Sequence, residues 1–241
     1  MKEVSLFIPC TVDLFLPQIG EATVLLLRRV GVNPVYHAEQ TCCGQPALNA
    51  GYRQEAKQAA KHFIRVFQRD EIIISPSGSC VCMVKTHYPE LLAGEPEWQR
   101  KAEELAGRIY ELTQFLVDVL QVEDVGAIFS GRLAYHESCH VLRGLGVSEQ
   151  PKRLLRAVKG AEMVPLKEAE TCCGFGGEFS VLFPEISEAM VKEKVDHYLA
   201  SGADLLLLCE PGCLLNIGGH LSRNHPGKQA MHLATFLATC G

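Results

Sequence analysis

The tetrapeptide TCCG at residues 41–44 decides how the chain is organised, because the same four residues recur at 171–174. A further cysteine precedes each copy, at Cys10 with 31 intervening residues and at Cys139 with 32. The copies are therefore offset by 129 residues at this cysteine and by 130 residues at the cysteine pair. Such a regular offset at three cysteines indicates an internal duplication.

The duplication continues downstream of each pair. SPSGSC at residues 75–80 corresponds to CEPGC at 209–213, and YELTQFL at 110–116 corresponds to MHLATFL at 231–237. We therefore expect two domains, over residues 1–128 and 129–241, with the boundary between residues 124 and 131.

Strand-like and helix-like patterns alternate in both halves. Short apolar runs predict strands at 4–9, 34–37, 72–74, 133–135, 162–166 and 205–208, and amphipathic or leucine-rich segments predict helices at 18–30, 53–68, 96–121, 151–158 and 186–199. Strands that alternate with helices over short connections form parallel sheets through right-handed crossovers. The sequence therefore predicts an α/β fold of two tandem Rossmann-like lobes with parallel sheets.

The overall composition excludes several classes of protein. With 241 residues, 47% hydrophobic and 21% charged, the chain is globular rather than disordered. A net charge of −5 without a basic run argues against nucleic acid as a partner. The apolar runs, such as LLLLC at 205–209, are too short for a membrane span, and MKEVSLFIPC at the start lacks the features of a secretory signal. We expect a cytoplasmic protein.

Eleven cysteines are unusual for such a protein, because the cytosol keeps thiols reduced and a chain of this length needs no disulfide framework. Ten of them follow predicted strands, where the loops of a parallel sheet converge on a ligand. This candidate cofactor-binding set is Cys10, Cys42, Cys43, Cys80, Cys82, Cys139, Cys172, Cys173, Cys209 and Cys213. Cys240 belongs to neither copy, and we expect no role for it.

Thiolates select zinc, copper(I) or iron–sulfur clusters. Two adjacent cysteines bind one ion with strain, because the planar peptide lies inside a small chelate ring, whereas two neighbouring irons accept both thiolates more easily. The pairs thus favour a polynuclear centre, with zinc as the alternative. Gly44 and Gly174 allow positive φ and a close backbone approach beside it.

HESCH at residues 136–140 formally matches the HExxH signature of zinc proteases. That signature needs a helix to bring both histidines to one face, but this segment ends a predicted strand. We expect His136, Glu137 and His140 instead to surround the second centre and to tune it through hydrogen bonds and charge.

The doubled pattern of a cysteine, a CCG tripeptide and a closing cysteine resembles the cysteine-rich (CCG) domain family, which includes the CCG-containing component of heterodisulfide reductase and the iron–sulfur component of glycolate oxidase. A chain of this length with two copies and no ferredoxin-type run is most similar to the lactate utilization protein A family. The resemblance implies an iron–sulfur cluster, of the [4Fe-4S] type, as cofactor. It implies metal ligation by Cys10, Cys42, Cys43 and Cys80 in one site and by Cys139, Cys172, Cys173 and Cys213 in the other. The closing motifs differ from the CxxC of the family, which leaves a fifth ligand, Cys82 or Cys209, open.

The resemblance also implies a function. We expect an electron-transfer subunit of an L-lactate oxidation complex, which works with partner iron–sulfur and lactate-utilization subunits, since the chain carries no flavin or nicotinamide signature. Any association with a membrane would run through those partners. Two alternatives are a thiol–disulfide redox catalyst, similar to heterodisulfide reductase, and a zinc-binding structural subunit.

Overall fold

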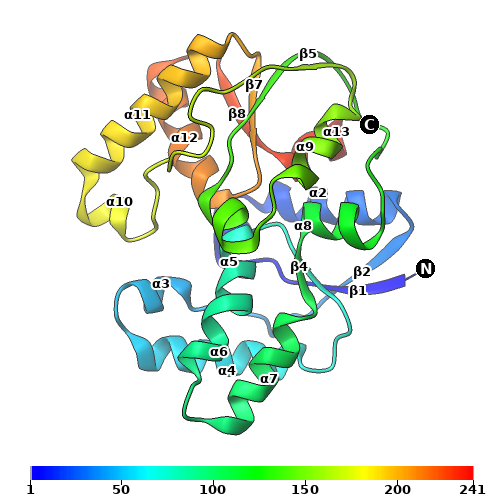
Figure 1. Ribbon diagram of the computed structural model, residues 1–241, viewed down its shortest axis with the longest axis vertical. Coiled ribbons are helices and arrows are strands. Elements are labelled where there is room, and N and C mark those ends of the chain that lie inside the picture. Colours follow the sequence, from blue (N-terminus) through cyan, green and yellow to red (C-terminus); the bar gives the residue numbers. More distant parts are fainter. Residues whose placement is uncertain (1, 241) are drawn as a thin grey trace.

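The computed structural model describes residues 2–240, which form two α/β lobes (Figure 1). Each lobe contains one parallel four-stranded sheet, with the strand order β2-β1-β3-β4 in the first and β6-β5-β7-β8 in the second. The strands are β1 (Lys2–Leu6), β2 (Val32–Tyr36), β3 (Ile73–Ser75), β4 (Ile109–Glu111), β5 (Ile128–Tyr135), β6 (Lys159–Met163), β7 (Leu205–Leu208) and β8 (Gln229–His232). The identical order confirms the predicted fold class of two related lobes.

Helices cover the faces of both sheets. In the first lobe they are α1 (Cys10–Phe15), α2 (Pro17–Arg29), α3 (Gln45–Asn49), α4 (Arg53–Phe67), α5 (Gly78–Cys82), the π-helix η1 (Met83–His87), α6 (Tyr88–Leu91), α7 (Pro96–Ala106), α8 (Leu112–Gln114) and the π-helix η2 (Phe115–Val119). In the second they are the π-helix η3 (His140–Gly144), α9 (Glu149–Arg156), α10 (Phe179–Leu182), α11 (Pro184–Ser201), α12 (Pro211–Asn224) and α13 (Leu233–Thr239). Within residues 2–240, no helix is long and apolar enough to cross a membrane.

Two sequence-based expectations about elements were wrong, and one strand was missed. The predicted helix over 96–121 contains β4, because Ile109 is fully buried and pairs with Ile73 of β3. The predicted strand at 162–166 lies three residues earlier, as β6, where pairing with β5 fixes its register. The fourth strand of the second lobe, β8, was not predicted, although its residues belong to a matched closing segment.

The two lobes share a hydrophobic core. Buried residues of α2, such as Leu26, and of α13, such as Phe236, belong to one continuous cluster, and the two helices lie side by side (Figure 1). Arg29 of α2 donates hydrogen bonds to the carbonyl oxygens of Leu237 and Ala238, at 3.0 and 2.8 Å, and so binds the carbonyl end of α13. Because this cluster spans both lobes, the division into residues 1–128 and 129–241 stays a prediction.

Candidate metal centre

The cysteines follow the carboxyl ends of equivalent strands in both lobes. Cys10 opens α1 after β1, the pair at 42–43 lies in the loop after β2, and Cys80 lies on α5 after β3. Cys139, the pair at 172–173 and Cys213 follow β5, β6 and β7 in the same way. The carboxyl ends of parallel strands meet at one edge of a sheet, so each set of loops converges there.

In the first lobe the four thiols lie in two close contacts. The Sγ atoms of Cys10 and Cys42 are 3.6 Å apart, and those of Cys43 and Cys80 are 3.4 Å apart. Hydrogen bonds from the Cys10 and Cys43 thiols lower the pKa of Cys42 to about 3, while the same contacts raise the pKa of Cys10 and Cys43. The hydrogen bonds thus favour the thiolate form of Cys42, which is the form that binds a cation.

The second lobe repeats this arrangement, and in it the pKa of two cysteines is lowered. Cys139 contacts Cys172, and Cys173 contacts Cys213. Hydrogen bonding from Cys139 and Cys173 lowers the pKa of Cys172 to about 2, and the Cys173 thiol lowers the pKa of Cys213 well below its usual value despite burial. His136 and Ser138 lie near Cys213 and act in the same direction. The surroundings of Cys172 and Cys213 therefore favour their thiolate forms.

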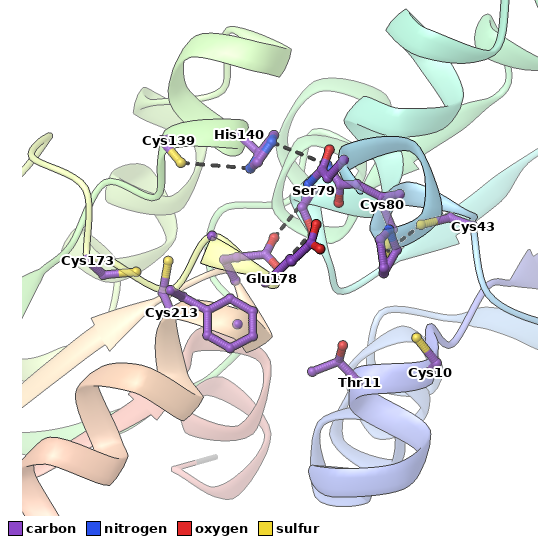
Figure 2. A pocket seen from close by; sticks show the side chains of 18 of the residues that line it. Cys10, Thr11, Cys43, Ser79, Cys80, Cys139, His140, Cys173, Glu178 and Cys213 are labelled. Carbon is purple, nitrogen blue, oxygen red and sulfur yellow. Dashed lines mark hydrogen bonds between the residues drawn. The ribbon is translucent and has the colours of Figure 1, made fainter. Parts of the chain in front are cut away.

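Both cysteine sets line one cavity of about 140 Å³ between the lobes. Figure 2 shows Cys139, Cys173 and Cys213 on one side of it and Cys10, Cys43 and Cys80 on the other. The eight cysteines expected as metal ligands all belong to its wall, which Thr11, Gln45, Ser79, His140, Glu178 and Glu210 help to complete. The sequence predicted one site in each lobe but gave no sign that the two sites share an opening.

The glycine of each CCG loop is required by its conformation and by its packing. Gly44 and Gly174 both have a φ of +84°. A Cβ atom would lie 2.9 Å from Ala59 Cβ at Gly44 and 2.8 Å from the Ser187 carbonyl oxygen at Gly174. The close approach is thus to α4 and α11. Each glycine N–H also donates to the Sγ atom two residues earlier, Cys42 or Cys172, at 3.4 Å.

Cys82 and Cys209, the candidates for a fifth ligand, lie outside the cavity wall. Cys82 is buried against Gly144, and its Sγ lies 3.9 Å from Thr86 Oγ1. Side chains two residues apart in a helix point in directions that differ by about 200°, so Cys80 and Cys82 face opposite sides of α5.

Cys209 lies in the shared core and accepts a hydrogen bond from the Tyr135 hydroxyl. Burial raises the pKa of both thiols. Cys240 packs against the shared core, also away from the cavity.

The HESCH segment begins in a loop after β5 and ends at the first residue of η3, so its histidines do not share a helical face. Glu137 accepts a hydrogen bond from Ser148 and forms an ion pair with Lys152, which directs it toward α9. His140 lies in the cavity wall, with Nδ1 3.8 Å from Cys139 Sγ and Nε2 3.3 Å from the Gln45 side-chain nitrogen. Burial lowers the pKa of His140, which favours its neutral form. His136 is fully buried beside Cys173 and Cys213.

One carboxylate that sequence reasoning missed connects the two lobes. Glu210 precedes α12 and accepts hydrogen bonds from the Ser79 backbone N–H at 2.7 Å, the Ser79 hydroxyl at 2.9 Å and the Ser77 hydroxyl at 3.2 Å. It thereby caps α5, the helix of the other lobe that carries Cys80. Burial raises the pKa of Glu210 to about 7. The repeat offered a signal, because Glu210 stands where SPSGSC has Ser77.

The donor set fits a metal centre bound by thiolates. Each lobe offers four converging sulfur atoms, and hydrogen bonding lowers the pKa of Cys42, Cys172 and Cys213 among them. Two thiolates on one tetrahedral ion, at about 2.3 Å each, lie about 3.8 Å apart, close to the 3.4 and 3.6 Å separations of the first lobe. In addition, the buried Nε2 of His136 has no hydrogen-bond partner among residues 2–240. A metal centre beside Cys213 would give this atom a partner.

Comparisons with known proteins agree with the sequence pattern. The family model described as "Cysteine-rich domain" (CCG) matches residues 4–85 and 133–218. The chain is 52% identical over 235 residues to lactate utilization protein A of Geobacillus kaustophilus (strain HTA426), with 98% of both chains covered. It is 51% identical over 234 residues to the protein of the same name from Shouchella clausii (strain KSM-K16), with 97% of this chain and 98% of that protein covered.

A solved structure shares the fold. It is that of a hypothetical protein from Helicobacter pylori, with a TM-score of 0.68 at 13% identity, over 99% of this chain and 49% of that one. The resemblance seen in the cysteine pattern is confirmed by the family model and by the full-length relatives. The chain therefore belongs to the cysteine-rich (CCG) domain family and, within it, to the family of lactate utilization protein A.

Proposed function

We propose that the chain acts in lactate utilization as an iron–sulfur electron-transfer subunit of an L-lactate oxidation complex. The observation that carries this proposal is the convergence of eight cysteines, four from each lobe, on one cavity. The names of the full-length relatives support the physiological context. An iron–sulfur cluster would supply one-electron transfer, while the protein sets the reduction potential and positions the partners.

The contacts of the vicinal cysteines favour a polynuclear centre over a single zinc ion. Cys42 contacts Cys10 from one loop, whereas Cys43 contacts Cys80 from another. The two cysteines of the pair thus lie next to two different sulfur atoms. This arrangement suits two irons of one cluster, each bound by one member of the pair. We propose Cys10, Cys42, Cys43 and Cys80 as ligands in the first lobe and Cys139, Cys172, Cys173 and Cys213 in the second, with a [4Fe-4S] cluster as the cofactor.

Several residues would tune such a centre. The N–H groups of Gly44 and Gly174 donate to Cys42 and Cys172, and hydrogen bonds to ligand sulfur raise a reduction potential. Burial of Cys43, Cys173 and Cys213 limits the access of water and oxygen to the sulfur atoms.

The decisive experiment is chemical analysis of protein purified without oxygen. We expect brown protein that contains iron and acid-labile sulfide and that gives an electron paramagnetic resonance (EPR) signal on reduction. Colourless protein with one zinc ion per lobe would reject the electron-transfer function and support the structural alternative.

The chain would work with partner subunits in the cytoplasm. Electrons from lactate would reach the chain from a partner subunit that holds the oxidising cofactor, and would leave it to a second iron–sulfur protein. We place this complex in the cytoplasm. Reconstitution with candidate subunits should give lactate-dependent reduction of the cluster, whereas lactate alone should leave the isolated chain oxidised.

The shared cavity favours one second candidate function. A thiol–disulfide catalyst needs a substrate site between the lobes, and the cavity lies there with cysteines of both lobes in its wall. In such a reaction two electrons and two protons convert one disulfide into two thiols. Turnover that depends on an added disulfide, measured with the loaded protein and a chemical reductant, would favour this function over simple electron transfer.

A further inference from the structure

His136 is held in one orientation directly after β5. Its side chain is fully buried, and its Nδ1 atom lies 3.1 Å from the carbonyl oxygen of Ala169. A carbonyl oxygen only accepts hydrogen bonds, so Nδ1 carries the proton in this contact. In the neutral imidazole the other nitrogen, Nε2, then presents a lone pair.

The Cys213 thiol lies beside the imidazole, and Cys173 and the imidazole both lower the pKa of that thiol. Among residues 2–240, Nε2 has no hydrogen bond of normal geometry, although a buried polar atom without one costs about 1–3 kcal/mol. Instead, one ring nitrogen of His136 and the Sγ atoms of Cys173 and Cys213 lie within 4.8 Å of one another, and all three residues are buried. Since Nδ1 donates to Ala169, Nε2 is the nitrogen with a lone pair available to this group. One nitrogen lone pair and two sulfur atoms thus face a common point.

We propose that His136 Nε2 is a direct ligand of the metal centre in the second lobe, next to Cys173 and Cys213. The assignment rests on the proposed function in requiring a metal centre there. It differs from the tuning role expected from the sequence, because Nε2 would bind the metal itself. The contact of Nδ1 with a backbone carbonyl is the usual second interaction of a metal-binding histidine, since it fixes both the tautomer and the ring orientation.

At the equivalent position the first lobe has a phenylalanine, which carries no donor atom. Phe7 stands three residues before Cys10, as His136 stands three residues before Cys139. It is fully buried and packs edge-on against Phe63 and Phe67, with ring centroids 4.7 and 5.9 Å away. The inference therefore makes the two centres chemically different, with sulfur ligands alone in the first lobe and a mixed sulfur and nitrogen set in the second.

Pulsed EPR on the full chain tests this assignment. The protein is labelled with nitrogen-15 histidine, purified without oxygen and reduced. We expect a nitrogen hyperfine coupling of the size found for metal-bound imidazole, which His136→Gln removes and the control His140→Gln retains, although His140 also lies beside a cysteine. A coupling that survives in His136→Gln, or only the weak coupling of a hydrogen-bonded histidine, would overturn the proposal.

A second measurement needs no iron and separates this inference from the proposed function. Co²⁺ is titrated into the reduced, metal-free protein carrying Cys43→Ser, which weakens the first site, and thiolate-to-cobalt absorption is followed. We expect His136→Gln to weaken Co²⁺ binding roughly tenfold or more and to shift the ligand-field bands, with thermal unfolding as the check that the variant is folded. Unchanged affinity and bands would exclude His136 as a ligand. His136-dependent Co²⁺ binding in a chain that never holds iron would refute only the iron–sulfur function.

Discussion

The two lobes keep the same sulfur positions but differ in the titratable groups around them. Both have a cysteine after the first strand, a CCG loop after the second and a cysteine on the helix after the third. At equivalent places, however, Phe7 stands opposite His136, Ser77 opposite Glu210 and Glu111 opposite His232. The comparison indicates that the thiol sets define the common chemistry of the copies, while their neighbours make the two sites unequal. Four predictions test how far this difference extends.

The largest effect concerns the ligands themselves. Cys43→Ser and Cys173→Ser each remove one thiolate, so each should lose roughly half of the bound iron and sulfide if the lobes bind separate centres. Iron and sulfide analysis after anaerobic purification measures the loss, and Cys240→Ser serves as the control that keeps both. If either ligand variant lost all iron, the cavity would hold one common centre instead of two.

The second prediction uses the opposite charges of Glu111 and His232. Both residues end the last strand of their lobe and cap the following helix. Burial raises the pKa of Glu111 to about 7 and lowers the pKa of His232 to about 4. Relative to the unfolded chain, Glu111 therefore stabilises the fold at low pH and loses this contribution as pH rises from about 4.5 to 7. His232 stabilises the fold above about pH 6.5 and loses this stabilisation as pH falls to 4.

Conservative variants should separate these two opposite pH dependences of the free energy of unfolding. Each amounts to about 3 kcal/mol over the pH range between the unfolded and folded pKa values. Between pH 5 and 6.5, Glu111→Gln should make the free energy of unfolding fall less steeply with pH than in the unchanged chain, because of the two carboxyls with a raised pKa only Glu210 remains. His232→Asn should make it fall more steeply, because the opposing contribution of the imidazole is lost. Urea unfolding of the metal-free protein at several pH values measures both slopes. Equal slopes in both variants would show that other groups control the pH dependence.

The third prediction compares the two CCG glycines. Gly174→Ala meets the backbone oxygen of Ser187, whereas Gly44→Ala meets the Ala59 methyl group, so we expect the larger destabilisation at Gly174. Both should lower the free energy of unfolding by about 2 kcal/mol more than Gly51→Ala does. Gly51 has a φ of +83°, but an added methyl group there would have nothing within 4 Å. Chemical unfolding of all three variants gives the order. A Gly51→Ala variant as unstable as the others would assign the whole cost to backbone strain.

The smallest effect is expected from the contact between the lobes at Glu210. Glu210→Ala removes three hydrogen bonds from the start of α5 and should cost about 1–2 kcal/mol. It should also speed alkylation of Cys80 in the metal-free protein more than that of Cys213, although Glu210 belongs to the second lobe. Mass spectrometry measures both rates, with Glu178→Ala as the control in the same cavity wall. Equal acceleration at both cysteines would indicate general loosening of the cavity.

Much of this architecture could be read from local patterns. The apolar runs before Cys10, Cys80 and Cys139 predicted strands, and the α/β alternation predicted parallel sheets whose loops converge. The strands β4 and β6 depend on pairing with neighbours, and the strand pattern of a three-residue segment such as Ile109–Glu111 is too short to be recognised locally. The orientation of Cys82 follows from the helical turn of α5, which the spacing CVC alone does not define.

The shared cavity and the role of Glu210 could not be predicted for a different reason. They depend on how one sheet is placed against the other, and the repeat gives the same information about both lobes but none about their contact. Gly78 illustrates this, because a Cβ atom there would lie 2.3 Å from Val141 Cγ2 of the second lobe. Nothing in SPSGSC shows that this glycine faces another lobe.

The packing of α13 on α2 has a consequence for synthesis of the protein. Arg29 and its acceptor Leu237 are 208 positions apart, so the apolar side of α2 leaves the ribosome long before the segment that covers it. At about 5–20 residues per second the delay is roughly 10–40 seconds. During that time the apolar residues of α2 that pack against α13 lack this cover, and exposed apolar surface of this kind promotes aggregation.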